Sequence, residues 1–266
     1  MDVSPYLSRL GVERTAVASP DVETLARLQR SHVTTVPFET LAVTGDPFSD
    51  REGEGVSLAP EALYEKIVER RRGGFCFELN GLFGRLLAEL GYDVRRVAAM
   101  VVSDGEARPP ANHLTHLVSL DRTYVVDVGL GGPPIRRPLP LDGDVRADGA
   151  GNEWRVVESD RPDSDYAVEY REPGDGAWEV RYVFGDTPRE LSYFEATCEY
   201  LQTAPESPFT GDPVVTLATD DGHLKLTPES FTRVAGGETR ERKVTEREWY
   251  AVLEREFGLR YRSAGE

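Results

Sequence analysis

The chain has 266 residues with 47 acidic and 31 basic side chains, and its net charge of −16 disfavours nucleic-acid binding, because the phosphate backbone would be repelled. Hydrophobic residues make up 39% and charged residues 29%, which is typical of a globular protein rather than a disordered or membrane protein. Because no run of 18 apolar residues occurs and the first residues lack the features of a signal peptide, we expect a cytoplasmic protein without a membrane partner.

The first third of the chain is predicted to be mostly helical. Ser4 and Ser19 each precede a proline, which suggests a serine N-cap with proline at the first helical position. A further helix is expected from Pro60, and another begins near Cys76 and ends at Gly91, which would serve as its C-cap. We therefore expect residues 1–92 to form a helical bundle that carries the nucleophile described below.

The middle of the chain changes to short runs rich in β-branched and aromatic residues, separated by Gly, Pro and Asp. The expected strands are Val94–Val102, Leu114–Leu120, Tyr124–Val128, Trp154–Val157 and Trp178–Val183. Residues 93–190 are thus predicted to form a central antiparallel β-barrel domain. The polar, Gly-rich segment Asp142–Asn152 is expected to be a mobile loop.

The last part of the chain mixes strand and helix patterns. Thr245 and Glu248 form a capping box before an apolar helical face, and Gly258 should end that helix. Residues 191–266 are predicted to be an α/β lid, so the fold class is α+β.

Cys76 is the candidate nucleophile. It follows Gly73 and Gly74 and opens a predicted helix, where unpaired N–H groups and the helix dipole favour a thiolate and could stabilise an oxyanion. The alternative is a buried structural cysteine. The only other cysteine is Cys198, in an aromatic segment, and we expect it to be structural. Two cysteines cannot build a disulfide scaffold, which fits a reducing compartment.

A thiolate nucleophile needs an imidazole base and a group that orients it. Asp127 is a carboxylate in an apolar predicted strand, so it needs a partner, and His113 and His116 lie on the preceding strand. The alternative is that Asp127 binds backbone N–H groups in a turn. Cys76, His113 and Asp127 lack a fourth ligand for zinc, and we expect no metal site.

The loop between the two strands decides which histidine meets Asp127. A two-residue loop would place His116 opposite Asp127, but Asp121-Arg122 is a poor turn of the type that such loops need. A three-residue loop places His113 and Asp127 as diagonal neighbours on one face. We therefore predict the three-residue loop, with His116 pointing the other way.

Several motifs resemble the arylamine N-acetyltransferase family, and together they span nearly the whole chain in order. The segment around the cysteine looks like that family's signature, and the segment before His113 resembles the one that carries its catalytic histidine. The similar segments are Val36–Glu39, Arg72–Asn80, Pro109–His113, Asp127–Gly131, Thr203–Phe209 and Phe257–Gly258. The chain departs from the family pattern at Thr40, Met100 and Leu130, which leaves the choice of acceptor open.

The resemblance implies a papain-like or transglutaminase-like cysteine core. Acetyl-CoA would acetylate Cys76, with His113 as the base and Asp127 orienting it, and the acetyl group would pass to an arylamine, arylhydrazine or related aromatic amine in a ping-pong reaction. By the same resemblance, Arg72 and Glu39 form a buried structural pair. The residues that it implies for substrate binding are Phe38, Gly129, Leu130, Gly131 and Phe209. No permanently bound cofactor is expected, and the protein would be a monomer or a weak homo-oligomer.

Other interpretations remain. An amide synthase of the same family would close an amide in natural-product assembly, and a Cys-His hydrolase or transglutaminase-like enzyme would share the catalytic order. The acidic balance, with only three lysines, indicates either good solubility or adaptation to a salty cytoplasm, in which case stability should rise with salt.

Overall fold

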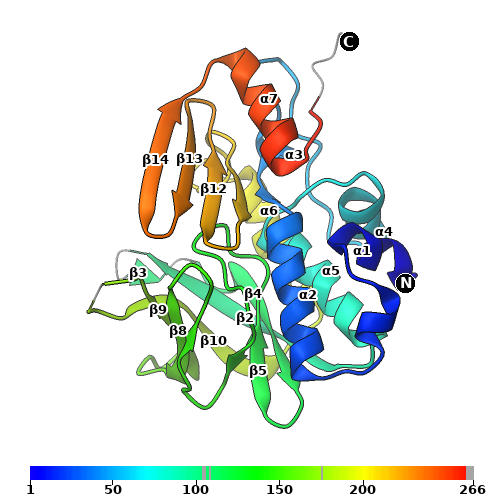
Figure 1. Ribbon diagram of the computed structural model, residues 1–266, viewed down its shortest axis with the longest axis vertical. Coiled ribbons are helices and arrows are strands. Elements are labelled where there is room, and N and C mark those ends of the chain that lie inside the picture. Colours follow the sequence, from blue (N-terminus) through cyan, green and yellow to red (C-terminus); the bar gives the residue numbers. More distant parts are fainter. Residues whose placement is uncertain (104–105, 108, 175, 262–266) are drawn as a thin grey trace.

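The computed structural model describes every residue except 104–105, 108, 175 and 262–266. Figure 1 shows three regions: helices from the start of the chain on one side, a curved sheet below, and a smaller sheet above. Helix α2 runs through the centre and borders both sheets. Within these residues, no helix has the length and apolar character needed to span a bilayer.

The helical segments of the first third share one hydrophobic core. Leu7, Leu25, Leu28 and Phe83 come from three different helices and are all almost completely buried in it. The segments are α1 (Val3–Leu10), η1 (Arg14–Val17), α2 (Val22–Thr35), α3 (Leu41–Thr44), α4 (Pro60–Tyr64), η2 (Glu65–Glu69) and α5 (Cys76–Glu89). Gly91 has a positive φ of 90° just after α5, as its predicted C-cap role requires.

Aspartates, not serines, cap the first two long helices. Asp2 accepts a hydrogen bond from the backbone N–H of Ser4 at 2.9 Å, and Asp21 accepts one from the N–H of Thr24 at 2.7 Å. The prediction of Ser4 and Ser19 as N-caps was therefore wrong. A carboxylate satisfies the first N–H groups and also carries the charge that the helix N-terminus favours, so it is preferred to a nearby serine.

The middle of the chain forms an antiparallel sheet that nearly closes into a barrel, as predicted. Its strands run in the order β6-β5-β4-β2-β10-β9-β8-β7, β3 pairs with β2, and β6 also lies against β8. The interior is apolar, with Leu117, Trp154 and Val168 fully buried. The strands are β2 (Asp93–Ser103), β3 (Glu106–Ala107), β4 (His113–Ser119), β5 (Thr123–Val126), β6 (Leu139–Pro140), β7 (Arg146–Ala147), β8 (Glu153–Glu158), β9 (Tyr166–Arg171) and β10 (Glu179–Pro188).

The register of β4 and β5 confirms the predicted three-residue loop. Ser119 pairs with Thr123 and His116 pairs with Val126, which leaves residues 120–122 as the connection. Strand β5 ends at Val126, however, so Asp127 lies just beyond the strand and not in its middle as predicted. The cause is local: the Asp127 side chain accepts the backbone N–H of Gly129 at 2.8 Å, which turns the chain away from the sheet.

The Gly-rich segment at 142–152 is anchored to the rest of the molecule, contrary to the expectation of a mobile loop. It contains β7, which pairs with β8. Asp148 is buried and lies 2.6 Å from Nη1 of Arg136. The carboxylate also accepts two backbone N–H groups of its own turn, so the buried charge has partners on every side.

The upper sheet joins the two ends of the chain. Strand β1 (Phe38–Glu39) comes from the N-terminal third and pairs with β11, which the sequence did not indicate. Trp249 and Leu253 of α7 pack onto this sheet, and the predicted capping box and Gly258 C-cap are both present. The elements are η3 (Leu191–Phe194), α6 (Glu195–Thr203), β11 (Val215–Ala218), β12 (Gly222–Leu226), β13 (Ser230–Ala235), β14 (Glu238–Lys243) and α7 (Glu246–Phe257).

The finding that Asp21, and not Ser19, is the N-cap of α2 can be tested by two substitutions. Asp21→Ala should lower the free energy of unfolding by about 1 kcal/mol, because the N–H of Thr24 loses its acceptor. Ser19→Ala is the matched control and should change it by less than ~0.5 kcal/mol. Urea unfolding measures both, and a larger loss for Ser19→Ala than for Asp21→Ala would contradict this assignment.

Candidate active site

Cys76 is the first residue of α5 and is held in place from both sides. Before it, the N–H of Phe75 donates to a carboxylate oxygen of Glu78 at 3.1 Å, which fixes the first turn of the helix. Gly74 bridges to strand β1, so the approach to the helix is tied to the upper sheet. The Cys76 side chain is almost fully buried, and its thiol donates to the carbonyl of Asn112 with Sγ and O 3.7 Å apart.

The helix start does not by itself make Cys76 a thiolate, which corrects the simple expectation from the sequence. Burial raises the pKa of the Cys76 thiol well above its usual value, and the negative charge of Asp127 raises it further. A backbone N–H of the helix acts in the opposite direction but is the weaker influence. Ionisation of Cys76 therefore requires a base that takes the proton within the site.

His113 and Asp127 form a short, buried pair. Nε2 of His113 lies 2.6 Å from Oδ2 of Asp127, and both side chains are essentially inaccessible to solvent. Although burial would raise the pKa of Asp127, the neighbouring His113 and the hydrogen bonds that the carboxylate accepts lower it below its usual value. Asp127 is thus ionised and Nε2 of His113 is the donor, which leaves Nδ1 as the ring nitrogen that can accept a proton.

His113 follows directly after an unusual turn. Ala111 has a positive φ of 55°, a conformation that non-glycine residues seldom adopt and that often occurs near functional sites. The turn directs the Asn112 side chain to accept the N–H of Val101 at 2.9 Å, while the Asn112 carbonyl meets the thiol of Cys76. The turn therefore brings the residue before His113 into contact with Cys76.

Asn80 is a site residue that the sequence reasoning did not single out. Its Nδ2 donates to Oδ1 of Asp127 and to the Leu114 carbonyl, both at 2.8 Å, and its Oδ1 accepts the N–H of Val128 at 2.9 Å. Asn80 lies four residues after Cys76, so both side chains lie on one face of α5. The available signal was an amide on the apolar face of that helix, where a polar group needs partners.

Gly129 makes the close packing of helix and loop possible. A Cβ at this position would lie 2.6 Å from Nδ2 of Asn80 and 2.9 Å from Cα of Cys76, so any side chain would push the loop away from α5. Gly131 has a similar, weaker restriction from the ring of Phe38. The glycines after Asp127 thus keep the loop against the helix that bears Cys76.

His116 is separate from the pair, as predicted. It pairs with Val126 on β5, and its ring lies against α5 at Gly84, where an added Cβ would be 2.2 Å from Nε2. Burial lowers the pKa of His116 to about 3, so the ring stays neutral at physiological pH. Neither ring nitrogen has a hydrogen-bond partner among the described residues.

Three aromatic rings lie beside the glycine loop. Phe209 is 5.6 Å from Phe75 and 6.1 Å from Phe38, measured between ring centroids, and Phe38 also contacts Gly131. Leu130, in contrast, is buried in the core of the barrel, so in this structure it is a packing residue. Phe38 and Phe209 are therefore the expected binding residues that lie together.

A buried group of charges supports the start of α5. Arg72 lies 2.8 Å from Glu39, the expected pair, and Lys66 lies 2.7 Å from Glu78, which the sequence reasoning did not identify. Lys66 and Arg72 lower the pKa of Glu39 against the effect of burial, whereas burial raises the pKa of Glu78. Lys66 also lies 3.9 Å from Glu39 and so connects the two pairs.

Removing Lys66 should therefore destabilise the protein in a pH-dependent way. Lys66→Met leaves Glu78 buried without its cation and should cost about 3–5 kcal/mol near pH 7. A carboxyl group whose pKa is raised by folding binds more protons when folded, so the deficit should shrink as pH falls.

The measurement is urea unfolding at several pH values. Lys225→Met is the matched control, because Lys225 is exposed on β12, and it should have little effect. A Lys66→Met deficit that stayed constant or grew at low pH would contradict the proposed role of Glu78.

Comparison with known proteins places this geometry in a family. The N-acetyltransferase family model matches residues 21–264. The arylamine N-acetyltransferase of Mycolicibacterium smegmatis is 34% identical over 85% of this chain and 80% of its own length. The proansamycin X synthase of Amycolatopsis mediterranei is 31% identical over 95% of each chain. The solved arylamine N-acetyltransferase of Salmonella typhimurium superposes with a TM-score of 0.86 at 30% identity, covering 99% of this chain and 93% of that one. The chain therefore belongs to the arylamine N-acetyltransferase family of enzymes.

Proposed function

We propose that the protein transfers an acetyl group from acetyl-CoA to an arylamine, arylhydrazine or related aromatic amine through a thioester on Cys76. The observation that carries this proposal is that the Cys76 thiol, at the start of α5, donates to the carbonyl of Asn112, and that the next residue, His113, is paired with Asp127. A buried thiol beside an oriented imidazole is the arrangement that nucleophilic acyl transfer needs. The names of the relatives support the acetyl group and the aromatic amine as substrates.

In the first half-reaction, the sulfur of Cys76 attacks the acetyl carbonyl of acetyl-CoA while His113 takes the thiol proton. The bond between the acetyl carbon and the CoA sulfur breaks, and His113 returns the proton to the departing CoA thiolate. Asp127 holds Nε2 of His113 and stabilises the imidazolium that forms in between. The N–H groups at the start of α5 are positioned to stabilise the oxyanion.

In the second half-reaction, the amine nitrogen attacks the thioester on Cys76. His113 accepts the proton that the nitrogen loses, the bond from sulfur to the acetyl carbon breaks, and the proton returns to the Cys76 sulfur. The amide is released and the resting thiol is restored. One base thus serves both halves, and His113, which is paired with Asp127, takes that role in this proposal.

The aromatic rings supply the acceptor's binding surface in this proposal. Phe38 and Phe209, which lie next to each other, would contact the ring of the amine, because aromatic rings attract one another in edge and offset arrangements. Gly129 and Gly131 have no side chains, so in this proposal they let the pantetheine arm of CoA pass.

A second candidate is an amide synthase that uses the same thioester to close an amide. The observation that favours it is the proansamycin X synthase, which matches this chain over nearly its full length. The two candidates differ in the acyl group and the amine, not in the residues at Cys76. A panel of aromatic amines and hydrazines with acetyl-CoA separates them, because turnover with simple arylamines favours the acetyltransferase.

The thioester itself is directly testable. Wild-type protein exposed to acetyl-CoA without an amine should gain one acetyl group by intact mass, because the acyl-enzyme waits for its acceptor. Cys76→Ala should gain none, and Cys198→Ala should still be acetylated, since Cys198 lies in the helical core. An unmodified wild type, or an acetylated Cys76→Ala protein, would overturn the proposal.

The same assay distinguishes the two histidines. His113→Ala should lose thioester formation by about 100-fold or more, since it removes the base. His116→Asn should keep most of it, because His116 lies against Gly84 and its ring forms no hydrogen bond with Asp127 or any other described residue. Thermal unfolding of both variants serves as the control for folding. A folded His116→Asn protein without thioester formation would contradict the assignment of His113, rather than His116, as the base.

A further inference from the structure

The loop from Asp127 to Ile135 carries the carboxylate and the glycines of the proposed active site. The partners of the Asp127 side chain are His113, Asn80 and the N–H of Gly129. The direction of a side chain also depends on where its own backbone lies. The alignment of the carboxylate with the imidazole therefore depends on the contacts that fix the backbone at the two ends of this loop.

Gln29 joins both ends of the loop to helix α2. Its side chain is completely buried, and its Nε2 donates to the carbonyl of Asp127 at 3.2 Å and to the carbonyl of Ile135 at 2.8 Å. Both protons of the amide nitrogen are thus used. The opposite orientation of the amide would place its oxygen against two carbonyl oxygens, so this position requires a donor.

Packing alone does not explain an amide at this position. Oε1 of Gln29 is buried and has no hydrogen-bond partner among the residues that the structure describes. An unpaired buried oxygen destabilises the folded state, and an apolar side chain of similar length would avoid that cost. What distinguishes Gln29 from such a side chain is its pair of hydrogen bonds to the loop.

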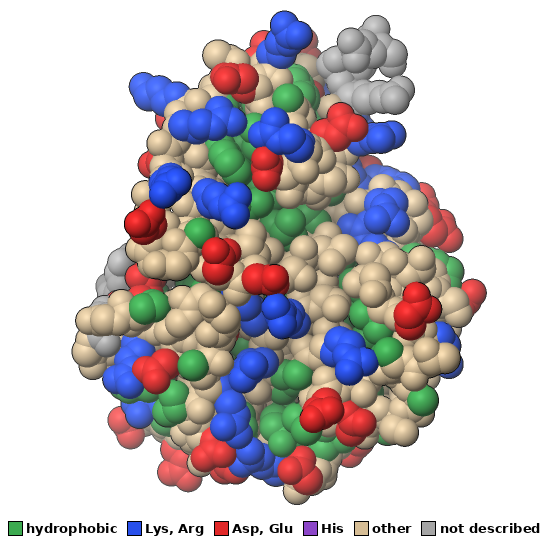
Figure 2. Space-filling view, viewed as in Figure 1, with side chains coloured by type: hydrophobic (Ala, Val, Ile, Leu, Met, Phe, Trp, Pro, Cys, Tyr) green, Lys and Arg blue, Asp and Glu red, His purple; other side chains and the backbone are tan. Residues whose placement is uncertain are grey.

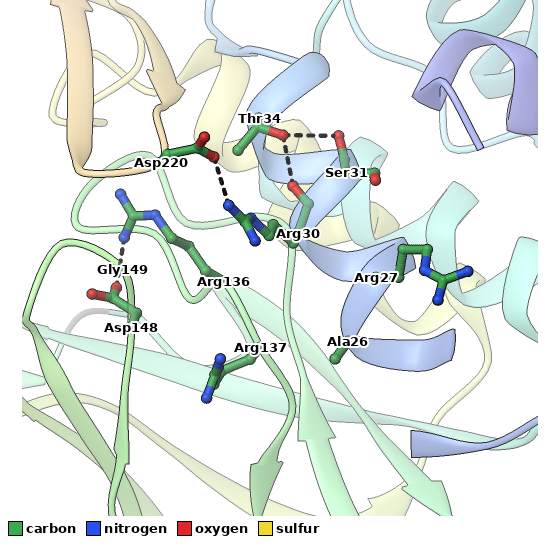
Figure 3. A pocket seen from close by; sticks show the side chains of 10 residues that line it. All are labelled: Ala26, Arg27, Arg30, Ser31, Thr34, Arg136, Arg137, Asp148, Gly149 and Asp220. Carbon is green, nitrogen blue, oxygen red and sulfur yellow. Dashed lines mark hydrogen bonds and ion pairs between the residues drawn. The ribbon is translucent and has the colours of Figure 1, made fainter. Parts of the chain in front are cut away.

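Ile135 is a firm anchor for this link. Its side chain is buried in the core of the barrel. The guanidinium of the next residue, Arg136, points to Asp148 with the nitrogen and oxygen 2.6 Å apart, as Figure 3 shows. Arg136 also donates to two backbone carbonyls at the connection between β11 and β12. Gln29 therefore ties the backbone of Asp127 to a residue that the barrel and the upper sheet already hold.

The solvent-facing side of α2 carries an exposed ion pair instead. Arg30 lies 2.9 Å from Asp220, but the two side chains are 59% and 78% exposed (Figure 3). Figure 2 shows basic and acidic side chains next to one another around the centre of the face that it displays. Exposed pairs of this kind contribute little to stability. The buried amide of Gln29, and not the exposed pair beside it, connects α2 to the proposed site.

We propose that Gln29 is a positioning residue for the base of the acyl-transfer site, an inference that rests on the proposed function. By holding the carbonyl of Asp127, the amide keeps the carboxylate in line with Nε2 of His113. Gln29 binds the backbone of Asp127, so it acts through that residue and not on a substrate. Without the donor the backbone could shift, and a misplacement of about 1 Å can cost on the order of 100-fold in rate.

Gln29→Met tests the proposal, because methionine fills a similar volume and has no donor. In a single turnover with acetyl-CoA, acylation of Cys76 should slow by about tenfold or more, whereas the acetyl-CoA concentration at half the maximal rate should change by less than about twofold. The downfield proton of the hydrogen bond between His113 and Asp127 should also shift in the NMR spectrum. Lower stability alone would not move that proton in folded protein. Arg30→Gln, at the next position of α2, is the matched control and should leave the rate and the proton unchanged.

Thermal unfolding establishes that each variant is folded at the temperature of the assay. If Gln29→Met does not fold, Gln29→His keeps one N–H donor and should still slow acylation by about threefold and shift the proton. A folded variant with both the wild-type rate and the wild-type proton position would overturn the proposal, as would equal losses in Gln29→Met and Arg30→Gln. The proton readout needs no turnover. Wild-type protein that formed no thioester would therefore contradict the proposed function, and the proton would still decide the role of Gln29.

Discussion

The structure depends on one buried charge, the carboxylate of Asp127. A carboxylate with no access to solvent is costly unless its oxygens are satisfied, and here three elements contribute the partners. His113 comes from β4, Asn80 from α5, and the N–H of Gly129 from the loop that follows. The requirement to satisfy Asp127 therefore holds barrel, helix and loop in one arrangement. His113 directly follows Asn112, whose carbonyl accepts a hydrogen bond from the Cys76 thiol.

The rest of the fold is arranged to keep this contact tight. The glycine at position 129 allows the loop to lie against α5, and the buried pairs of Arg72 with Glu39 and of Lys66 with Glu78 hold the start of that helix. Buried ion pairs add little net stability, but they are strongly destabilising to break, so they favour a single geometry at the helix start. The helical core and the barrel core meet at β4, whose two faces belong to different cores.

Sequence patterns predicted the features that depend on residues close together in the chain, such as turns and the strand register that they set. The poor turn chemistry of Asp121-Arg122 indicated the three-residue loop, and that loop placed His113 rather than His116 beside Asp127. Features that depend on distant contacts were not predictable in this way. The pairing of β1 with β11 joins segments far apart in sequence, and the role of Asn80 appears only when α5 lies against the loop after Asp127. The N-caps were missed for another reason, since a serine and an aspartate stood close together and both are good caps.

The position of the proton on His113 tests the account most directly. In ¹⁵N-histidine-labelled Cys76→Ala protein at neutral pH, with resonances assigned through His113→Asn, the neutral ring should carry its proton on Nε2, because the ionised Asp127 accepts from that atom. That proton should appear far downfield, as expected for a short, charge-assisted hydrogen bond. A His113 ring protonated on Nδ1 instead would contradict the account, because Asp127 would then not accept a hydrogen bond from Nε2 and would not orient the proposed base.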